Sequence, residues 1–357
     1  MKTASFPLVL CLTLVSQSLL NVQQPANDSV LGNVTWTISN LCRGKPQPCL
    51  AAVQPAIAAL KYLICKCNVD DIVTDALWAL SDISDGEDAR TDAIIQGDKG
   101  ITRKLVQLVD SKKPHVIAPA LRVLGNFVSG NEEQTQEVID AGVLDVVMTI
   151  INGQEKNLRK EMCWLLSNMA AGTQKQITKL VETRYIADML VTMAVEAEWE
   201  TRKEAIWAVS NIFTGGTDRC VSLLVNQKGI DAMVAVLDDP REQRMTLVAL
   251  DAIDKILAVG ERNNYRYNIL LDECGGIEKL ELLQHHTDNA VYEKSLEILE
   301  RFFGEEEADD ENLAPAFDGH AFAFGLSSLP PAKFLFGGPK NTPTNPFGSA
   351  NSFNFGR

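Results

Sequence analysis

The chain has 357 residues, of which 46% are hydrophobic, and a formal net charge of -14 at pH 7. This hydrophobic content excludes a chain that is disordered throughout, and the length allows either two compact domains or one elongated repeat array. The surplus of Asp and Glu argues against a nucleic-acid-binding protein, because phosphate groups are held by surplus Lys and Arg. Basic partners are the natural expectation.

The first 28 residues form an atypical segment with two interpretations. Met1 and Lys2, followed by the apolar run from Phe6 to Val15, have the charge and hydrophobic centre of a secretory signal peptide, so that residues 1–22 would direct secretion. In the alternative interpretation, the stretch from Leu8 to Leu20 belongs to a truncated repeat helix. No other apolar run is long enough to span a membrane, and we expect no membrane partner.

The eight Cys are scattered, and most lie in apolar helical patterns, which is typical of a reducing compartment. There is no CxxC pair, and Cys65 and Cys67 are a poor start for a tetrahedral zinc site in a chain with four His. We therefore expect buried thiols, no metal and no other cofactor. The His residues have no paired motif around them, so we expect no enzymatic activity.

A short phrase recurs along the chain: a small or apolar residue, Trp, two or three apolar or small residues, and then Asn or a substitute for it. Its Trp residues are Trp36, Trp78, Trp164 and Trp207, and a fifth copy has Arg122 instead. These positions are about 42 to 44 residues apart, within the range of about 40 to 47 for HEAT and armadillo units. The sequence is therefore an array of repeats.

Each unit is expected to contain three helices, because apolar residues recur with helical spacing in three pieces. In one unit these pieces are Gln174 to Glu182, Ile186 to Ala194 and Arg202 to Phe213. A glycine pair or a glycine-containing pair follows the third helix, and we expect its glycine to end that helix in a left-handed conformation. These pairs are Asp85-Gly86, Ser129-Gly130, Ala171-Gly172 and Gly215-Gly216. A short first helix distinguishes armadillo units from two-helix units.

These patterns predict an all-α fold, a right-handed armadillo-repeat superhelical solenoid over residues 29–304 with about seven units, the first of them partial. The last two units, Met245 to Gly260 and Ala290 to Gly304, keep the apolar spacing but lack the Trp, and Asp251 falls in its place. Residues 305–357 are an acidic run followed by a segment rich in Gly, Pro and Phe, which we expect to be a disordered tail.

The recurring phrase also predicts a binding groove. Trp and Asn four residues apart lie on one face of a helix, so stacked units carry a Trp ladder beside an Asn ladder. Asn carboxamides can hold the backbone of an extended peptide, and Lys stems can lie between indole rings with about 0.5 to 2 kcal/mol of cation-π attraction each. Asp75, Glu161 and Glu204 lie three residues before three of the Trp residues. The simpler interpretation, packing Trp and helix-ending Asn, does not account for the repetition.

Several phrases resemble the importin-α (karyopherin-α) family of nuclear import adaptors, notably Trp36 to Lys45, Pro119 to Gln136, Asp272 to Leu280 and Tyr292 to Phe303. The resemblance covers about residues 29–311. It implies a minor-type peptide site and a residual major-type site. The minor-type site comprises Arg122, Asn126, Ser129, Thr135, Glu161, Trp164, Asn168, Glu204, Trp207 and Asn211. The residual major-type site comprises Trp36, Asn40, Asp75, Trp78 and Asp85.

The resemblance also implies partners and location. We expect nuclear localisation signal peptides of cargo proteins as ligands, the family's export receptor at the C-terminal repeats, and residence in the cytoplasm and nucleus. Family members begin with a basic importin-β-binding segment, whereas this chain has only Lys2 before Arg43, so importin-β is not an expected partner by the usual route. Two alternatives stay open: a truncated importin-α that sequesters cargo, and an armadillo scaffold with another partner.

Overall fold

The computed structural model describes residues 28–304 except Lys45, residues 97–99 and residues 239–242, and also the backbone of residues 316–317 and 322–323. It contains two separate units, Met1–Gly304 and Glu305–Arg357. In the second unit, strands β1 (Ala316–Phe317) and β2 (Phe322–Ala323) pair antiparallel. The predicted signal-like segment and the rest of the predicted disordered tail lie outside the described residues.

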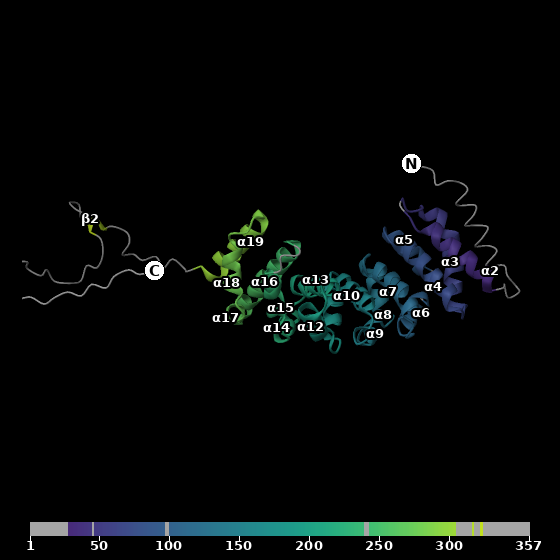
Figure 1. The fold of residues 1–357 in the computed structure, drawn as a ribbon. Helices are drawn as coiled ribbons and strands as arrows, with labels where there is room; N and C mark the ends of the chain where they lie inside the picture. Colours follow the sequence, from purple (N-terminus) through teal and green to yellow (C-terminus); the bar gives the residue numbers. More distant parts are fainter. Residues whose placement is uncertain are drawn as a thin grey trace, which may run out of the picture. The chain divides into compact units, whose positions relative to one another are not determined.

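Residues 28–304 fold into helices that follow the predicted units (Figure 1). The chain starts with α2 (Asp28–Cys42), α3 (Leu50–Lys66) and α4 (Asp70–Ser84). Three-helix units follow: α5 (Asp88–Ile95), α6 (Gly100–Val109) and α7 (Pro114–Val128); α8 (Glu132–Asp140), α9 (Val143–Ile151) and α10 (Lys156–Ala170); α11 (Gln174–Glu182), α12 (Ile186–Glu196) and α13 (Trp199–Gly215); α14 (Asp218–Asn226), α15 (Gly229–Leu237) and α16 (Gln243–Asn263); α17 (Tyr267–Glu273), α18 (Gly276–Leu283) and α19 (Asn289–Phe303). The predicted three-helix unit is confirmed in these five cases.

The segment between α2 and α4 differs from the prediction, because α3 is the one helix described there and no short first helix precedes it. Pro46 and Pro48 stand where that helix would begin, and proline removes a backbone donor and clashes with the preceding turn. The Gln47 side chain lies between them in sequence. Its amide nitrogen donates to the carbonyl oxygens of Asp82 and Asp85, at 2.6 Å in both cases.

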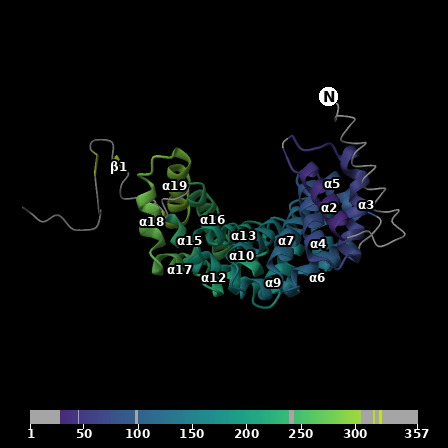
Figure 2. The same cartoon turned by 45° about the vertical axis from the view of Figure 1, so that its right-hand side comes forward.

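The third helices of the units stack in one row, in which each helix contacts the next: α2, α4, α7, α10, α13, α16 and α19. Figure 2 shows α7, α10, α13 and α16 on the concave side of this row. The row buries a continuous apolar core, with side chains such as Phe127 and Phe213 fully enclosed. Residues that point away from this core along the third helices are therefore exposed side by side, one set per unit.

The predicted left-handed glycines after the third helices are confirmed only at Gly86, where φ is 131°. The prediction was wrong for the pair Gly215-Gly216, where α13 includes Gly215 and Gly216 has a φ of -75°. It was also wrong for Gly130 and Gly172, which follow the ends of α7 and α10 but have no positive φ. Their role is to leave space for a glutamine. A Cβ on Gly130 would overlap with Oε1 of Gln134, and one on Gly172 would stand 2.5 Å from Oε1 of Gln176.

These two glutamines join neighbouring units. Each belongs to a capping box that starts its helix, α8 or α11. Their amide nitrogens reach back to the preceding unit, where Gln134 donates to the carbonyl oxygen of Asp88 at 3.0 Å and Gln176 to that of Glu132 at 2.9 Å. Each glutamine side chain thus caps the start of its own helix and also holds that helix to the preceding unit.

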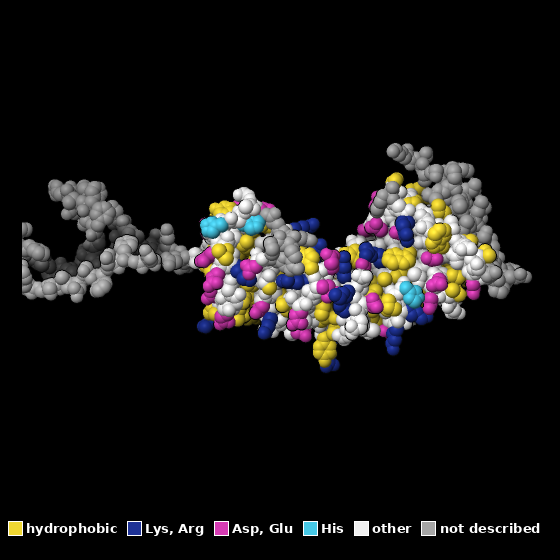
Figure 3. Space-filling model, viewed as in Figure 1, with side chains coloured by type: hydrophobic (Ala, Val, Ile, Leu, Met, Phe, Trp, Pro, Cys, Tyr) yellow, Lys and Arg dark blue, Asp and Glu magenta, His cyan; other side chains and the backbone are white. Residues whose placement is uncertain are grey.

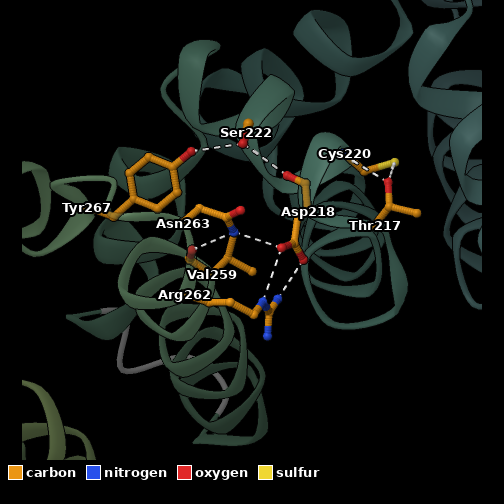
Figure 4. A network of polar contacts seen from close by, with 8 residues as sticks. All are labelled: Thr217, Asp218, Cys220, Ser222, Val259, Arg262, Asn263 and Tyr267. Carbon is orange, nitrogen blue, oxygen red and sulfur yellow. Dashed lines mark hydrogen bonds and ion pairs between the residues drawn. The ribbon is translucent and has the colours of Figure 1, made fainter.

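A polar network holds the later units together (Figure 4). The Asp218 carboxylate accepts hydrogen bonds from the Arg262 guanidinium and from the Asn263 amide, at 2.5 and 2.7 Å. The Tyr267 hydroxyl lies 3.0 Å from that of Ser222. These contacts join α14 to α16 and α17.

Within the described residues, no single helix is long and apolar enough to cross a membrane. Helices α14 and α15 reach the required length and composition only as a pair that is bent by 80°.

Candidate peptide-binding groove

In each of the first five units, the recurring phrase lies at the same position of the last helix, the one that belongs to the row. Its marker residue is the ninth residue of the helix: Trp36 in α2, Trp78 in α4, Arg122 in α7, Trp164 in α10 and Trp207 in α13. The Asn or its substitute is the thirteenth: Asn40, Asp82, Asn126, Asn168 and Asn211. Because these helices are adjacent in the row, both sets form ladders across units.

The ring of Trp164 is positioned by a glycine in the neighbouring helix. A Cβ on Gly125 of α7 would overlap with three carbon atoms of this indole, so the ring lies directly against the α7 backbone. The indole is half-buried, and its remaining surface is open to solvent. The absence of a side chain at one helix position therefore sets the tilt of a ring in the next unit.

Trp164 also contacts Arg122. The Arg122 guanidinium carbon lies 5.1 Å from the centre of the indole, within cation-π range, and a guanidinium nitrogen lies 2.5 Å from Oε1 of Glu161. The other Glu161 oxygen, Oε2, is buried without a hydrogen-bond partner. The unit with Arg in place of Trp thus supplies a cation to the Trp of the next unit.

Trp207 has a similar contact on the side of the following unit. Arg244, the second residue of α16, has its guanidinium carbon 5.1 Å from the centre of the Trp207 ring. Both indoles of the predicted minor-type site therefore already bind a cation of the same chain. In Figure 3, Lys and Arg side chains, in dark blue, lie around the hollow above the middle of the row.

Carboxylates lie one turn before the Trp residues, as the sequence predicted. Burial raises the pKa of Glu204 above its ordinary value, and Glu161 and Glu200 raise it further, while Lys160 and Lys203 act in the opposite direction. Burial also raises the pKa of Asp75. Burial makes such a carboxylate costly to ionise. A further cation that binds beside it stabilises the charged form and so lowers the raised pKa.

The Asn ladder differs from one unit to the next in its hydrogen bonds. The amide nitrogen of Asn126 donates to the Ser81 carbonyl and the Ser84 hydroxyl, both at 2.9 Å, and that of Asn211 donates to the Ser167 carbonyl at 3.0 Å. These two side chains join third helices. The amide nitrogen of Asn168 is buried and has no hydrogen-bond partner. Asn168 therefore differs from Asn40, Asn126 and Asn211, whose amide nitrogens each donate at least one hydrogen bond.

Asn168 lines a pocket of about 480 Å³ where α7 and α10 end and α8 and α11 begin. The predicted residues Ser129 and Thr135 also line it. Their hydroxyls donate to backbone carbonyls, Ser129 to Asn126 at 2.8 Å and Thr135 to Asn131 at 3.1 Å. The hydroxyl oxygens can still accept hydrogen bonds, so the pocket offers acceptors to an incoming ammonium group.

Two family models match the chain: an atypical armadillo repeat over residues 265–316 and an armadillo/beta-catenin-like repeat over residues 131–171. Importin subunit alpha-3 of Arabidopsis thaliana is 37% identical over 320 residues, which cover 86% of this chain and 59% of that protein. Importin subunit alpha-1a of Oryza sativa subsp. japonica is 39% identical over 307 residues, covering 83% and 57%. The chain is a relative of the importin-α subunits.

Solved structures agree with the armadillo fold of this importin-α relative. A designed armadillo repeat protein in complex with the peptide (KR)4 superposes with a TM-score of 0.61 at 28% identity, over 69% of this chain and 99% of that one. A second designed armadillo protein gives a TM-score of 0.62 at 26% identity. The predicted armadillo solenoid and the resemblance to importin-α are confirmed. The chain spans less than two thirds of the length of the curated relatives described above.

The residual major-type residues lie on the adjacent helices α2 and α4 and just after α4. Trp36 is 61% exposed, and the amide nitrogen of Asn40 donates to the Trp36 carbonyl of its own helix at 2.8 Å. Trp78 and Asp75 are half-buried on α4, whereas Asp85 is exposed beyond the end of that helix. The structure thus brings Arg122, Glu161, Trp164, Asn168, Glu204 and Trp207 together on three adjacent helices.

Two residues of the groove were missed in the sequence. Arg244 lies in a unit without the recurring phrase, so the phrase could not identify it. Gly125 was part of the phrase, but its contact with Trp164 depends on the distance between two helices. The spacing of 39 residues between Arg122 and Glu161, close to one repeat, was a signal that could have indicated their ion pair.

Proposed function

We propose that this importin-α relative is an adaptor for nuclear protein import that binds extended basic peptides, of the kind of nuclear localisation signals, in the groove around Trp164 and Trp207. The observation that supports it best is that each of these rings already holds a guanidinium at 5.1 Å. Indoles that attract Arg within the chain will attract Lys and Arg of a peptide in the same way.

Two further features support a basic ligand. The half-buried Glu204, with its raised pKa, lies one turn from Trp207. Asn168, whose buried amide nitrogen has no hydrogen-bond partner and would donate to a peptide carbonyl after a side-chain rotation, lines a pocket that suits a Lys side chain. The peptide (KR)4 in the designed armadillo complex has the same cationic chemistry. Asn126, Ser129, Thr135 and Asn211 then shape the walls of the groove.

The proposal extends to partners and location. Cargo proteins with basic signals are the expected ligands, and cytoplasm and nucleus are the expected compartments. The C-terminal units are the proposed contact for an export receptor. An importin-β pull-down separates an import adaptor from the alternative, a chain that sequesters cargo without delivering it.

Fluorescence anisotropy with a labelled Lys- and Arg-rich peptide tests the groove. We expect saturable binding that weakens at higher salt and is lost in the double variant Trp164→Ala and Trp207→Ala. Trp199→Phe is the matched control, because Trp199 starts the same helix α13 but lies outside the ladder. Circular dichroism checks that each variant is folded. Unchanged binding in a folded double variant, or absence of binding to the parent chain at low salt, contradicts the proposal.

A further inference from the structure

Arg122 and Arg244 lie at opposite ends of the Trp164–Trp207 pair. Arg122 belongs to α7, which packs on α10 and its Trp164, and Arg244 belongs to α16, which packs on α13 and its Trp207. The row runs α7, α10, α13, α16. Each guanidinium therefore approaches its indole from the side away from the other indole.

This order leaves one slot open. An indole has two faces, and each ring has an arginine of this chain over it, which comes from the outer neighbouring helix. The faces that remain available to a peptide are those that Trp164 and Trp207 turn towards the space between α10 and α13. Glu161 and Glu204 stand at corresponding positions of these two helices, and Glu161 forms an ion pair with Arg122.

We propose that Arg244, together with Arg122, determines which basic peptides bind: the two guanidiniums close the Trp164–Trp207 slot at its ends and select a short basic core with acidic rather than basic flanks. This inference rests on the proposed function. It assigns to Arg244 a role as a specificity-determining residue of the groove.

The dimensions of an extended peptide give the positions of these flanks. Packed helices are about 8 to 10 Å apart, and an extended chain rises about 3.3 Å per residue. One unit therefore corresponds to about three peptide residues. With a Lys or Arg in the slot, the peptide residues about three positions before and after it meet Arg122 and Arg244. A basic residue there is repelled, and an acidic residue forms an ion pair.

The two arginines are held differently. Arg122 has a fixed partner in Glu161, and its side chain is 45% exposed. Arg244 is exposed and lies over the ring of Trp207. A substitution of Arg244 therefore changes the charge at one end of the slot and leaves the Arg122–Glu161 ion pair at the other end intact. This makes Arg244 the residue to vary.

The experiment compares three labelled peptides with the same Lys-Arg core. One has neutral flanks, one has Glu three residues before and after the core, and one has Lys at those two positions. The parent chain is expected to bind the Glu-flanked peptide best and the Lys-flanked one worst. In Arg244→Ala, the ratio of these two affinities should fall about fivefold at low salt, while affinity for the neutral peptide changes by less than about twofold.

Arg244→Glu should lower the ratio further, because the charge at that end is reversed. Arg184→Ala is the matched control, since Arg184 makes a cation-π contact with Tyr185, at 4.4 Å, outside the groove. An unchanged ratio in Arg244→Ala overturns the role of Arg244. An equal gain in affinity for all three peptides in Arg244→Ala also overturns this role, because it would mean that Arg244 occupies the slot itself. A parent chain that binds none of the three overturns the proposed function, and this inference with it.

Discussion

The indole of Trp164 lies against the backbone of Gly125, at a distance that leaves no room for a Cβ atom between them. Gly125→Ala would therefore push the ring away from α7 or force the two helices apart. We expect a loss of about 1 to 3 kcal/mol in the free energy of unfolding, as for other overpacked sites. Peptide affinity should fall at the same time, because the tilt of Trp164 changes.

Gly32→Ala is the control for this substitution. Gly32 lies in α2, another third helix, and a Cβ there would make only an ordinary contact with Ile72 at 3.8 Å. We expect it to be neutral or to stabilise the chain by about 0.5 to 1 kcal/mol. Urea unfolding of both variants, followed by Trp fluorescence, makes the comparison. Similar effects at the two positions would contradict the contact described for Trp164.

Asn126 and Asn168 occupy the same position in successive units but differ in their bonds. Asn126→Ala removes two hydrogen bonds to α4, one to the Ser81 carbonyl and one to the Ser84 hydroxyl, so it should cost about 1 to 3 kcal/mol of stability. Asn168→Ala removes an amide nitrogen that has no partner, so its effect on stability should be below about 0.5 kcal/mol.

Peptide affinity should distinguish the same two variants. Asn168→Ala should weaken binding by about tenfold or less, the value of one hydrogen bond to the peptide backbone. Thermal unfolding and anisotropy titrations on the same preparations measure both properties. A large loss of stability in Asn168→Ala, without any loss of affinity, would assign this side chain to packing alone.

The sequence predicted the third helices and the ladders well, because both depend on local spacing. A period of about 43 residues and a Trp-to-Asn distance of four residues are sufficient to put Trp164 and Asn168 on one face of α10. The bonds of each Asn could not be predicted in this way. Whether an amide reaches a carbonyl one unit away depends on the packing of two helices that are far apart in the sequence.

The cations in the groove were also beyond prediction. Arg122 was visible as a departure from the recurring phrase, but the ring that it contacts lies 42 residues later. Arg244 belongs to a unit in which Asp251 replaces the marker residue, so no pattern linked it to Trp207. Gly130 and Gly172 do follow the third helices, as predicted. The reason for glycine at these positions is the space that a glutamine side chain occupies, which depends on side-chain rotamers.

The turn before the second helix of the last four three-helix units offers a third prediction. Gly142, Tyr185, Lys228 and Gly275 occupy this turn in successive units, with φ values of 90°, 68°, 64° and 73°. This left-handed conformation costs a residue other than glycine about 1 to 2 kcal/mol. Lys228→Gly should therefore raise the free energy of unfolding by about 1 kcal/mol, and Gly142→Ala should lower it by a similar amount.

Gly142→Ala is informative because a Cβ there meets only Asp145, at 3.4 Å, so its effect reports the backbone conformation rather than a clash. Thermal unfolding by circular dichroism measures both variants. If Lys228→Gly destabilises the chain, the Lys228 side chain contributes more through its contacts than its backbone conformation costs.

The last prediction concerns the pH dependence of peptide binding through Glu204. Burial raises the pKa of this carboxyl above its ordinary value, so the carboxylate becomes protonated at a higher pH than an exposed glutamate. A bound Lys or Arg favours the charged form and lowers that pKa. Affinity should therefore decrease as the pH falls from neutral towards about pH 5, and binding near the raised pKa should release a proton.

Glu204→Gln separates this effect from the other charges around it. At neutral pH the variant should bind the peptide about tenfold more weakly or less, and its affinity should change less with pH. Because the ionised carboxylate is destabilised by burial, the variant should be as stable as the parent chain at neutral pH. Calorimetric titrations in two buffers with different ionisation enthalpies measure the released proton. A parent and a variant with the same pH dependence would place the titrating group elsewhere, with Glu161 and Glu200 the nearest carboxylates that act on Glu204.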